Sequence, residues 1–279
     1  NLLTVDFMDK MLGARVSWID WLIAGAPWAV IMSAVLIFIV LKLLPPESDS
    51  IPGGKAAVSK TLAELGPMTG AQKRLMTVSV LLLLAWATEG KLHHFDTTST
   101  TYAGLVILLL PRLGVMTWKD VQARIPWGTV IVFGVGISLG TTLLTTQAGQ
   151  WLGAQVVANT GLDQLGTLGV FSILAAFLIV IHLGFASATA LTSALLPILI
   201  AVLQTLPGDF SRLGMTMALG FVVSYGFILP INAPQNMVCL GTETFNAKQF
   251  ARVGILVTVI GYLLMLVFAA TWWHWLGWM

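Results

Sequence analysis

The chain has 279 residues, of which 57% are hydrophobic and 9% are charged, and its mean hydropathy is +0.89. A typical soluble domain carries about 25% charged residues, so this composition excludes an ordinary soluble fold and indicates a lipid bilayer as the solvent. A net charge of +2, without a basic patch interleaved with aromatic residues, excludes a nucleic-acid-binding protein.

The apolar residues fall into blocks close to the roughly 20 residues that a helix needs to cross a bilayer. The chain opens at Asn1 rather than at a methionine and without a signal-peptide pattern, so we expect a truncated start. Plain membrane-spanning helices are predicted at about 21–44, 75–92, 102–115, 127–146 and 253–273, with a polar linker over 45–74 and a short interfacial helix within 147–166. Four tryptophans close the chain and predict an aromatic belt at the membrane surface: Trp272, Trp273, Trp275 and Trp278.

Two further apolar segments are interrupted near their middles. Residues 168–206 contain no Asp, Glu, Lys or Arg and are too long for one helix, and the run from Gly184 to Ala190 divides them into two predicted arms. Residues 213–244 are broken by the run from Pro230 to Asn236, because two prolines remove backbone donors and kink a helix. Unpaired backbone groups cannot face lipid, so such breaks are buried or line a cavity. Helix N-termini there would favour an anion and free carbonyls a cation, which predicts a binding site.

The distribution of basic residues predicts the topology. Alternating the loops across the membrane places ten Lys and Arg residues on one side and four on the other, and the richer side is expected to be cytoplasmic. This alternation works only if residues 168–206 enter and leave the membrane on the same side, as a re-entrant hairpin does. The 45–74 linker is then cytoplasmic.

The same order of sequence segments occurs twice in the chain. Asn236 is followed by an apolar pair, a polar turn, an amphipathic segment with two basic residues and a membrane span, and Asn1 begins the same succession. Broken helices recur at corresponding positions in transporters built from inverted repeats. The chain is therefore predicted to begin at the repeat equivalent of Asn236.

These residues resemble the divalent-anion/sodium symporter family, which comprises citrate, dicarboxylate and sulfate transporters. Ser187-Ala188-Thr189, followed by Leu195-Leu196-Pro197-Ile198, resembles the family's second Ser-Asn-Thr hairpin signature, and Ala233-Pro234-Gln235-Asn236 resembles its second Thr-Pro-Pro-Asn break. The segment from Trp127 to Gly136 is similar to the glycine-rich span that precedes the hairpin. The resemblance covers nearly the whole chain.

The resemblance implies an all-α membrane protein with an inverted-repeat transporter fold. Residues 1–44 would end the first repeat with one membrane helix, and residues 75–279 would form the second repeat. That repeat would hold the re-entrant hairpin at about 168–206, the broken helix at about 213–244 and the last helix at about 253–273. A homodimer in the inner (plasma) membrane is also implied, with no cofactor other than sodium ion.

The family's binding residues map onto positions of this chain. Ser187, Ala188 and Thr189 of the hairpin tip, with Ala233 and Pro234 of the break, are implied as substrate-binding residues. The chain departs from the pattern because Ala188 replaces the asparagine of the tip and Ala233 replaces the threonine of the break.

The implied second sodium site would lie around Ala186, Ala188 and Asn232. The missing amide at Ala188 weakens the expectation of sodium coupling through this half of the protein. His182 fits a His-x-x-x-Ala-Ser-Ala-Thr pattern similar to that of the family's carboxylate exchangers. An ionisable group inside a membrane is costly and hence a functional candidate, so His182 is a possible charge-compensating residue, with a neutral structural histidine as the alternative.

We therefore expect secondary active transport of small di- or tricarboxylates, or of sulfate, coupled to sodium or working by anion exchange. Its partners would be a small anionic substrate and the lipid bilayer. A membrane-embedded enzyme is an alternative, but it needs converging ionisable groups. The charged residues between 124 and 248 all lie in or near predicted loops or helix ends: Asp163, Asp209, Arg212 and Glu243. A truncated fragment that does not transport is a further alternative.

Overall fold

The computed structural model describes residues 1–46, 53–125 and 127–279, without the side chains of Thr129, Val132, Phe133 and Leu144. Part of the predicted linker thus lies outside the described residues. The described part of the chain forms helices and no β-strand, apart from an isolated bridge between Glu89 and His93. The predicted all-α class is confirmed.

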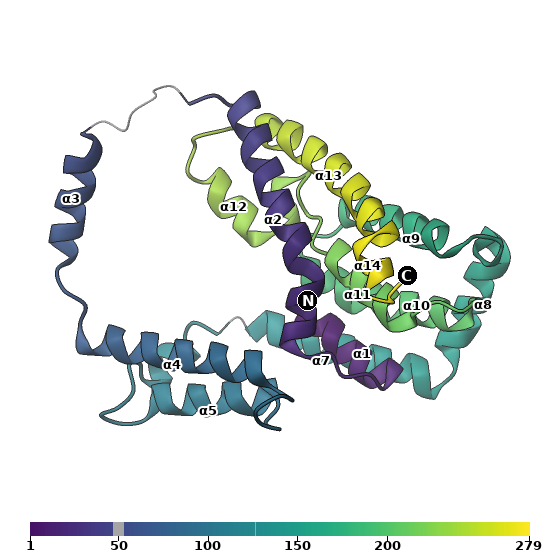
Figure 1. Cartoon of the computed structure of the whole chain (residues 1–279), viewed down its shortest axis with the longest axis horizontal. Coiled ribbons are helices and arrows are strands. Elements are labelled where there is room, and N and C mark those ends of the chain that lie inside the picture. The colour runs from purple at the N-terminus through teal and green to yellow at the C-terminus, as the bar shows by residue number, and fades with distance from the viewer. Residues whose placement is uncertain (47–52, 126) are drawn as a thin grey trace. The chain divides into compact units, whose positions relative to one another are not determined.

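The helices are shown in Figure 1. In chain order they are α1 (Leu2–Leu12), α2 (Trp18–Leu43), α3 (Gly54–Leu65), α4 (Gly70–Thr88), α5 (Thr97–Leu109), α6 (Trp118–Gln122), α7 (Trp127–Thr145), α8 (Ala148–Thr160), the 3₁₀ helix η1 (Leu162–Gln164), α9 (Thr167–His182), α10 (Ala188–Thr205), α11 (Arg212–Val222), the 3₁₀ helix η2 (Pro230–Asn232), α12 (Pro234–Leu240), α13 (Ala247–Ala270) and α14 (Trp272–Trp275).

Several of these helices are long and apolar enough to cross a membrane. Within the described residues they are α2, α10 and the stretch Ala247–Trp275 formed by α13 and α14, and α5, α9 and α11 are shorter apolar helices. The first and last predicted spans thus correspond to long apolar helices. A bilayer accepts them because every backbone group inside a helix is hydrogen-bonded within the helix.

The chain divides into two compact units. The first comprises residues 1–16, 24–43 and 127–279, and the second comprises residues 17–23 and 44–126. The boundaries of the two predicted repeats concern homology between halves, so they stay a prediction. The two units are considered separately below.

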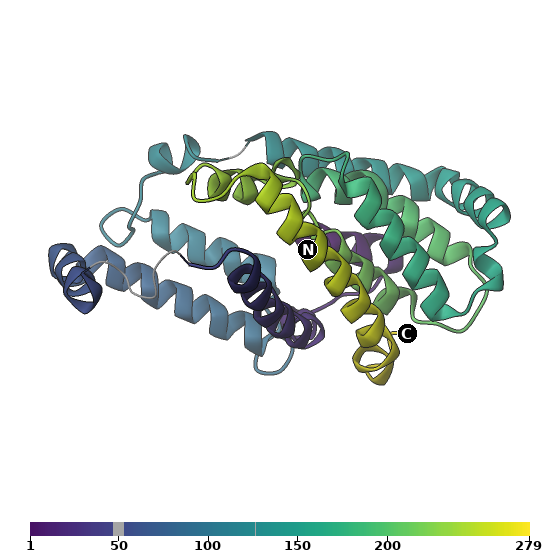
Figure 2. The same cartoon turned by 90° about the horizontal axis from the view of Figure 1, so that it is seen from above.

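In the first unit, α10 is the central helix. It packs against α7, α8, α1 and α11. Leu191, Leu196, Ile200 and Leu203 of α10 are all completely buried. Leu196, Ile200 and Leu203 share one face of the helix. Because every residue from Leu199 to Leu203 is buried, the C-terminal half of α10 is covered on all sides. The α13 helix packs against α9 in the same unit (Figure 2).

Trp273 lies in the core of this unit and not in the predicted aromatic belt. Its side chain is fully buried, and its indole N–H donates a hydrogen bond to the carbonyl oxygen of Ala24 at 3.1 Å. The ring contacts Phe171, Phe221 and Phe268 with centroid separations of 5.9, 5.8 and 6.0 Å. The belt prediction was therefore wrong for Trp273, because α14 directs this side chain back among α2, α9, α11 and α13.

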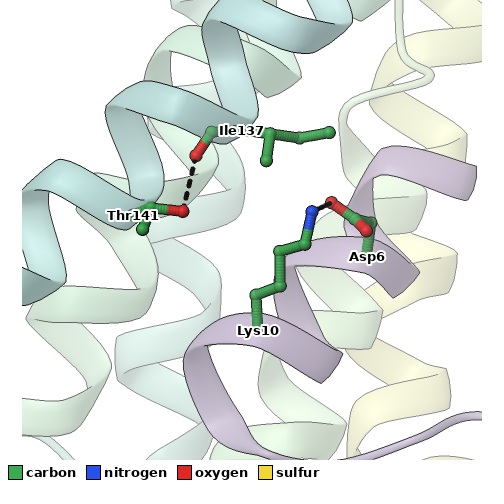
Figure 3. Close-up of polar contacts among 4 residues, drawn as sticks. All are labelled: Asp6, Lys10, Ile137 and Thr141. Carbon is green, nitrogen blue, oxygen red and sulfur yellow. Dashed lines mark hydrogen bonds and ion pairs between the residues drawn. The ribbon is translucent and has the colours of Figure 1, made fainter.

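Helix α1 packs against α7 as well as against α10 and α11. Figure 3 shows the ion pair between Lys10 and Asp6 on α1, with an N–O distance of 3.0 Å, and the neighbouring turn of α7. On α7 the hydroxyl of Thr141 donates to the carbonyl oxygen of Ile137 at 3.0 Å. Such a bond to the preceding turn satisfies a hydroxyl within an apolar helix.

The second unit contains α4 and α5 packed side by side. A capping box starts α4, because the Thr69 hydroxyl accepts from the amide of Gln72 and the Gln72 side chain accepts from the amide of Thr69. Trp18 and Trp86 contact each other in this unit, with ring centroids 6.5 Å apart. The predicted linker contains α3, of which no residue is buried.

Candidate functional site

The first break separates α9 from α10. Helix α9 ends at His182, and α10 begins at Ala188. Ser187 is the N-cap of α10, and its hydroxyl accepts a hydrogen bond from the amide of Ala190 at 3.5 Å. Thr189 follows in the first turn and is half-buried. The first turn of this 18-residue helix therefore presents backbone N–H groups and the positive end of the helix dipole, which favour an anion.

The second break begins earlier than the sequence predicts. Helix α11 ends at Val222, and the chain stays irregular, apart from η2, until Pro234 starts α12. The prolines therefore do not kink a continuous helix: Pro230 opens η2 and Pro234 occupies the first turn of α12, where its missing N–H costs nothing. The Asn236 side chain donates to the carbonyl oxygen of Gly226 at 2.7 Å and so closes the irregular segment on itself.

Asn232 joins the two breaks. This residue is 1% exposed, and its side-chain nitrogen donates to the carbonyl oxygens of His182 and Phe185, both at 2.8 Å. Its side-chain oxygen accepts from the amide of Leu229 at 3.1 Å. One amide thus bonds to three backbone groups, of which the His182 carbonyl oxygen also accepts from the Phe185 amide at 3.0 Å, and this ties the end of α9 to η2.

His182 lies against the same irregular segment. It is 1% exposed, and neither ring nitrogen has a hydrogen-bond partner among the residues that the structure describes. A Cβ atom on Gly226 would lie 3.0 Å from Nε2 of His182 and 3.2 Å from Cβ of Asn232. A larger residue at position 226 would displace the imidazole, so Gly226 is what allows the two breaks to approach this closely.

A cavity of about 250 Å³ opens beside the first turn of α10. Its wall is formed by the start of the chain, by α10 and by the segment that follows α11. The lining residues are Asn1, Leu2, Leu3, Ala188, Thr189, Thr192, Val223 and Ser224. Hydroxyl groups, a side-chain amide and apolar side chains line it, and none of these side chains is charged.

The structure brings some of the expected site residues together at this cavity. Ala188 and Thr189 line it, whereas Ser187 caps the helix beside it. Ala233 is buried and Pro234 is exposed, and neither belongs to the cavity lining.

Of the residues implied around a sodium site, Ala186 is exposed in the turn between α9 and α10, and Ala188 starts α10. Asn232 is engaged with the two carbonyl oxygens described above. The sequence predicted a helix that continues through Ser224 and Gly226, so neither residue was expected near the site. The available signal was a serine and a glycine on either side of Tyr225 within an apolar run.

Titratable residues do not form a metal site. Within the described ranges no group of three or more His, Cys, Asp or Glu residues could hold a metal ion. In the second unit, Nε2 of His93 lies 2.9 Å from the carbonyl oxygen of Ala85, and Asp96 is the N-cap of α5. Hydrogen bonds from the backbone and hydroxyl of Ser99 hold the pKa of Asp96 below its usual value. These side chains are engaged in forming the turn between α4 and α5.

Comparison with known proteins identifies the family. The family model described as "Sodium:sulfate symporter transmembrane region" matches residues 1–279. The chain belongs to the sodium:sulfate symporter family. This is a family of transporters of small anions and not of enzymes, so the resemblance to anion/sodium symporters is confirmed and the enzyme alternative is not supported.

Relatives in this family cover the whole length of the chain or nearly so. A protein named "Membrane protein" from Cupriavidus necator is 72% identical over 278 residues, which are 100% of this chain and 54% of the relative. "Inner membrane protein YbhI" from Escherichia coli is 30% identical over 282 residues, covering 100% of this chain and 57% of the relative. "Sodium-dependent dicarboxylate transporter SdcS" from Staphylococcus saprophyticus is 26% identical over 275 residues, covering 93% of this chain and 51% of the relative.

The chain spans about half the length of these relatives. It is a multi-pass protein of the inner membrane, as its long apolar helices and its family indicate.

Proposed function

We propose that the complete protein is a secondary active transporter of small di- or tricarboxylates, or of sulfate. The observation that carries this proposal is the cavity of about 250 Å³ at the start of α10, where uncharged hydroxyl and amide groups meet a helix N-terminus. Pockets for drug-sized ligands usually measure about 300–1,000 Å³, so this cavity suits a small anion. The name of the SdcS relative, a sodium-dependent dicarboxylate transporter, supports the same substrate class.

In this proposal α9 and α10 are the arms of a re-entrant hairpin, and α11 and α12 are the two halves of a broken membrane helix. Residues 1–44 would close the first of two inverted repeats, residues 75–279 would form the second, and two copies would form a homodimer. The similar order of segments after Asn1 and after Asn236 supports the repeat, and the position of Asn1 in the cavity wall supports a site shared by both repeats.

The substrate would be held by uncharged groups of the hairpin tip. The hydroxyls of Ser187 and Thr189 and the free backbone N–H groups around Ala188 would donate to a carboxylate or sulfate oxygen. Ala233 and Pro234 would contribute only backbone and apolar contacts, since neither side chain can donate a hydrogen bond. Binding to a charged group strengthens each of these hydrogen bonds.

Transport at this site can be coupled in two ways, and each uses different groups of the protein. In sodium symport, carbonyl oxygens around Ala186 and Ala188, together with the side-chain oxygen of Asn232, would coordinate the ion. In anion exchange, a protonated His182 would compensate the charge of the substrate. The loss of a side-chain amide at Ala188 favours exchange.

The test of the substrate site is uptake of radiolabelled succinate, citrate and sulfate into proteoliposomes that contain the complete polypeptide. Thr189→Val removes one hydroxyl and keeps the shape of the side chain. A hydrogen bond to a charged group contributes about 1.5–3 kcal/mol, so we expect the apparent affinity to fall about ten- to a hundredfold. Thr160→Val is the matched control, because Thr160 is exposed and its hydroxyl bonds to the Val156 carbonyl. Equal uptake by both variants and the wild type would remove Thr189 from the site.

The coupling mechanism is tested in the same vesicles with and without a sodium gradient, and with and without internal carboxylate. Accumulation driven by sodium would establish symport despite the alanine at position 188. Uptake that is independent of the sodium gradient and requires internal carboxylate would establish exchange. The absence of uptake for all three anions under every condition would contradict the proposed function.

A further inference from the structure

Helix α3 is amphipathic, and the described residues of its own unit leave both of its faces exposed. It comprises Gly54–Leu65, and none of its residues is buried. Val58, Leu62 and Leu65 are 59%, 67% and 76% exposed. Their spacing of four and three residues places them in one stripe along the helix. Ala56 and Lys60 lie on the opposite side.

A free helix of this length needs a surface to stabilise it. Isolated helices shorter than about 12–15 residues are marginal in water, and α3 has 12 residues. It has no side-chain hydrogen bond at its N-cap, and Gly66, with a φ of 67°, ends it. Alanine, lysine and leucine favour the helical conformation, but such preferences alone do not hold so short a segment. The apolar stripe must therefore be covered for the helix to persist.

The position of α3 in the chain keeps it close to the bilayer surface. It follows the membrane-spanning α2 in sequence, and only residues 66–69 separate it from α4. An extended chain reaches at most about 3.6 Å per residue, so Leu65 lies within roughly 18 Å of Gly70. The apolar run of α4 begins at Leu75, directly after two basic residues, which marks the membrane surface there. A tethered helix meets that surface at a high effective concentration, so even a weak affinity suffices.

The charges around the stripe match an anionic surface. Lys55 borders the stripe at the start of α3, Lys60 lies on the water-facing side, and Lys73 follows at the start of α4. Within residues 54–73 the one acidic residue is Glu64. A lysine beside an apolar stripe can place its stem in the interface and its ammonium group at the phosphates. Each basic residue near an anionic leaflet adds to the attraction, which acts over about a Debye length.

We propose that α3 is an interfacial anchor that lies on anionic lipid headgroups. Val58, Leu62 and Leu65 enter the boundary between headgroups and acyl chains, and Lys55 and Lys73 face the lipid phosphates. Lys60, on the water-facing side, adds to the electrostatic attraction over a longer distance. The anchor holds the segment between α2 and α4 flat on the membrane. This inference depends on the membrane location of the chain and not on the transported substrate.

The experiment measures the depth of nitroxide labels on α3 in the complete polypeptide, reconstituted into lipid nanodiscs. The native Cys239 is exposed, so it is first replaced in Cys239→Ser. Single labels are then placed by Leu62→Cys on the stripe and by Ala56→Cys on the opposite side. In nanodiscs that contain phosphatidylglycerol, we expect the Leu62→Cys label to collide several-fold more with oxygen than with a water-soluble nickel chelate. The Ala56→Cys label should show the reverse preference.

Lipid charge separates this anchor from other occupants of the stripe. The contrast between the two labels should decrease in phosphatidylcholine alone, at high salt, and when Lys55, Lys60 and Lys73 are replaced together by glutamine. Equal accessibility of both labels in anionic nanodiscs would overturn the proposal. It would also be overturned by protection of the Leu62→Cys label that is independent of lipid charge, which indicates a protein partner, or by spin–spin broadening between labels, which indicates a second copy of the chain.

Discussion

Removing the side chain of Asn232 should disconnect the two breaks. In Asn232→Ala, three hydrogen bonds are lost: the Phe185 carbonyl oxygen and the Leu229 amide lose their partner, and the His182 carbonyl oxygen keeps only the bond from the Phe185 amide. Each such bond contributes about 0.5–1.5 kcal/mol net, so the loss should be about 3 kcal/mol. For a unit of this size we expect the midpoint of thermal unfolding to fall by about 6–12 °C.

Asn232→Asp tests what the amide does there. The substitution keeps the oxygen that accepts from Leu229 but places a second oxygen where the nitrogen now donates to two carbonyl oxygens at 2.8 Å. Acceptors would then face acceptors, so a linking role predicts that Asn232→Asp is at least as unstable as Asn232→Ala. A main role as a sodium ligand predicts the opposite order in the presence of sodium, because a carboxylate is a strong ligand for a hard cation.

The assay is the thermal unfolding of the purified complete polypeptide in detergent, with and without sodium, followed by uptake in proteoliposomes. Asn159→Ala is the matched control, since Asn159 is exposed and its amide makes one bond, to the Gln155 carbonyl at 2.7 Å. That variant should unfold within about 2 °C of the wild type, as surface substitutions usually do. The linking role is refuted if Asn232→Ala is no less stable than Asn159→Ala, or if sodium makes Asn232→Asp the more stable of the two Asn232 variants.

Three further predictions concern other parts of the chain. Trp273→Ala should destabilise the protein by about 3–5 kcal/mol, because a fully buried ring and its hydrogen bond are removed, whereas Trp275→Ala, at a side chain that is 75% exposed, should change the unfolding midpoint little. His182→Gln should alter the pH dependence of anion uptake if the imidazole carries charge during transport, and an identical pH profile would assign it a structural role. Since hydrogen bonds from Ser99 lower the pKa of Asp96, its stabilisation of the start of α5 should be present at neutral pH and lost as the pH falls through that lowered pKa. The protection factor of the Ser99 amide, which corrects hydrogen exchange for its intrinsic pH dependence, should therefore fall on acidification in the wild type, and an equal fall in Asp96→Asn would contradict this account.

The two breaks differ in how well the sequence locates them. The tip between α9 and α10 lies where small and polar residues interrupt a long apolar run, because local composition is enough to end a helix there. The end of α11 at Val222 has no comparable local signal. It depends on Gly226 meeting the ring of His182 and on the Asn236 amide reaching the Gly226 carbonyl, and these contacts join residues from different elements.

The residues of the candidate site also divide into those that the sequence indicates and those that only the packed structure brings together. The sequence indicated Thr189 as a polar residue at a predicted helix end, since a helix N-terminus has properties that do not depend on distant residues, and the resemblance to the symporter family indicated Ala188. It could not indicate that Ser224 and Asn1 line the same cavity, because that proximity arises only when α1, α10 and the segment after α11 pack together.

The sequence by itself determined the membrane environment, the helical class, the family and the first break, because apolar blocks and helix-ending residues act locally along the chain. Only the tertiary structure decided the early end of α11, the link that Asn232 makes between the breaks, and which of the terminal tryptophans is buried. Trp273 and Trp275 are the same residue type two positions apart, yet one is fully buried and the other is 75% exposed. The difference lies in the helices that happen to meet at Trp273, and the identity of those neighbours is a property of the packed fold.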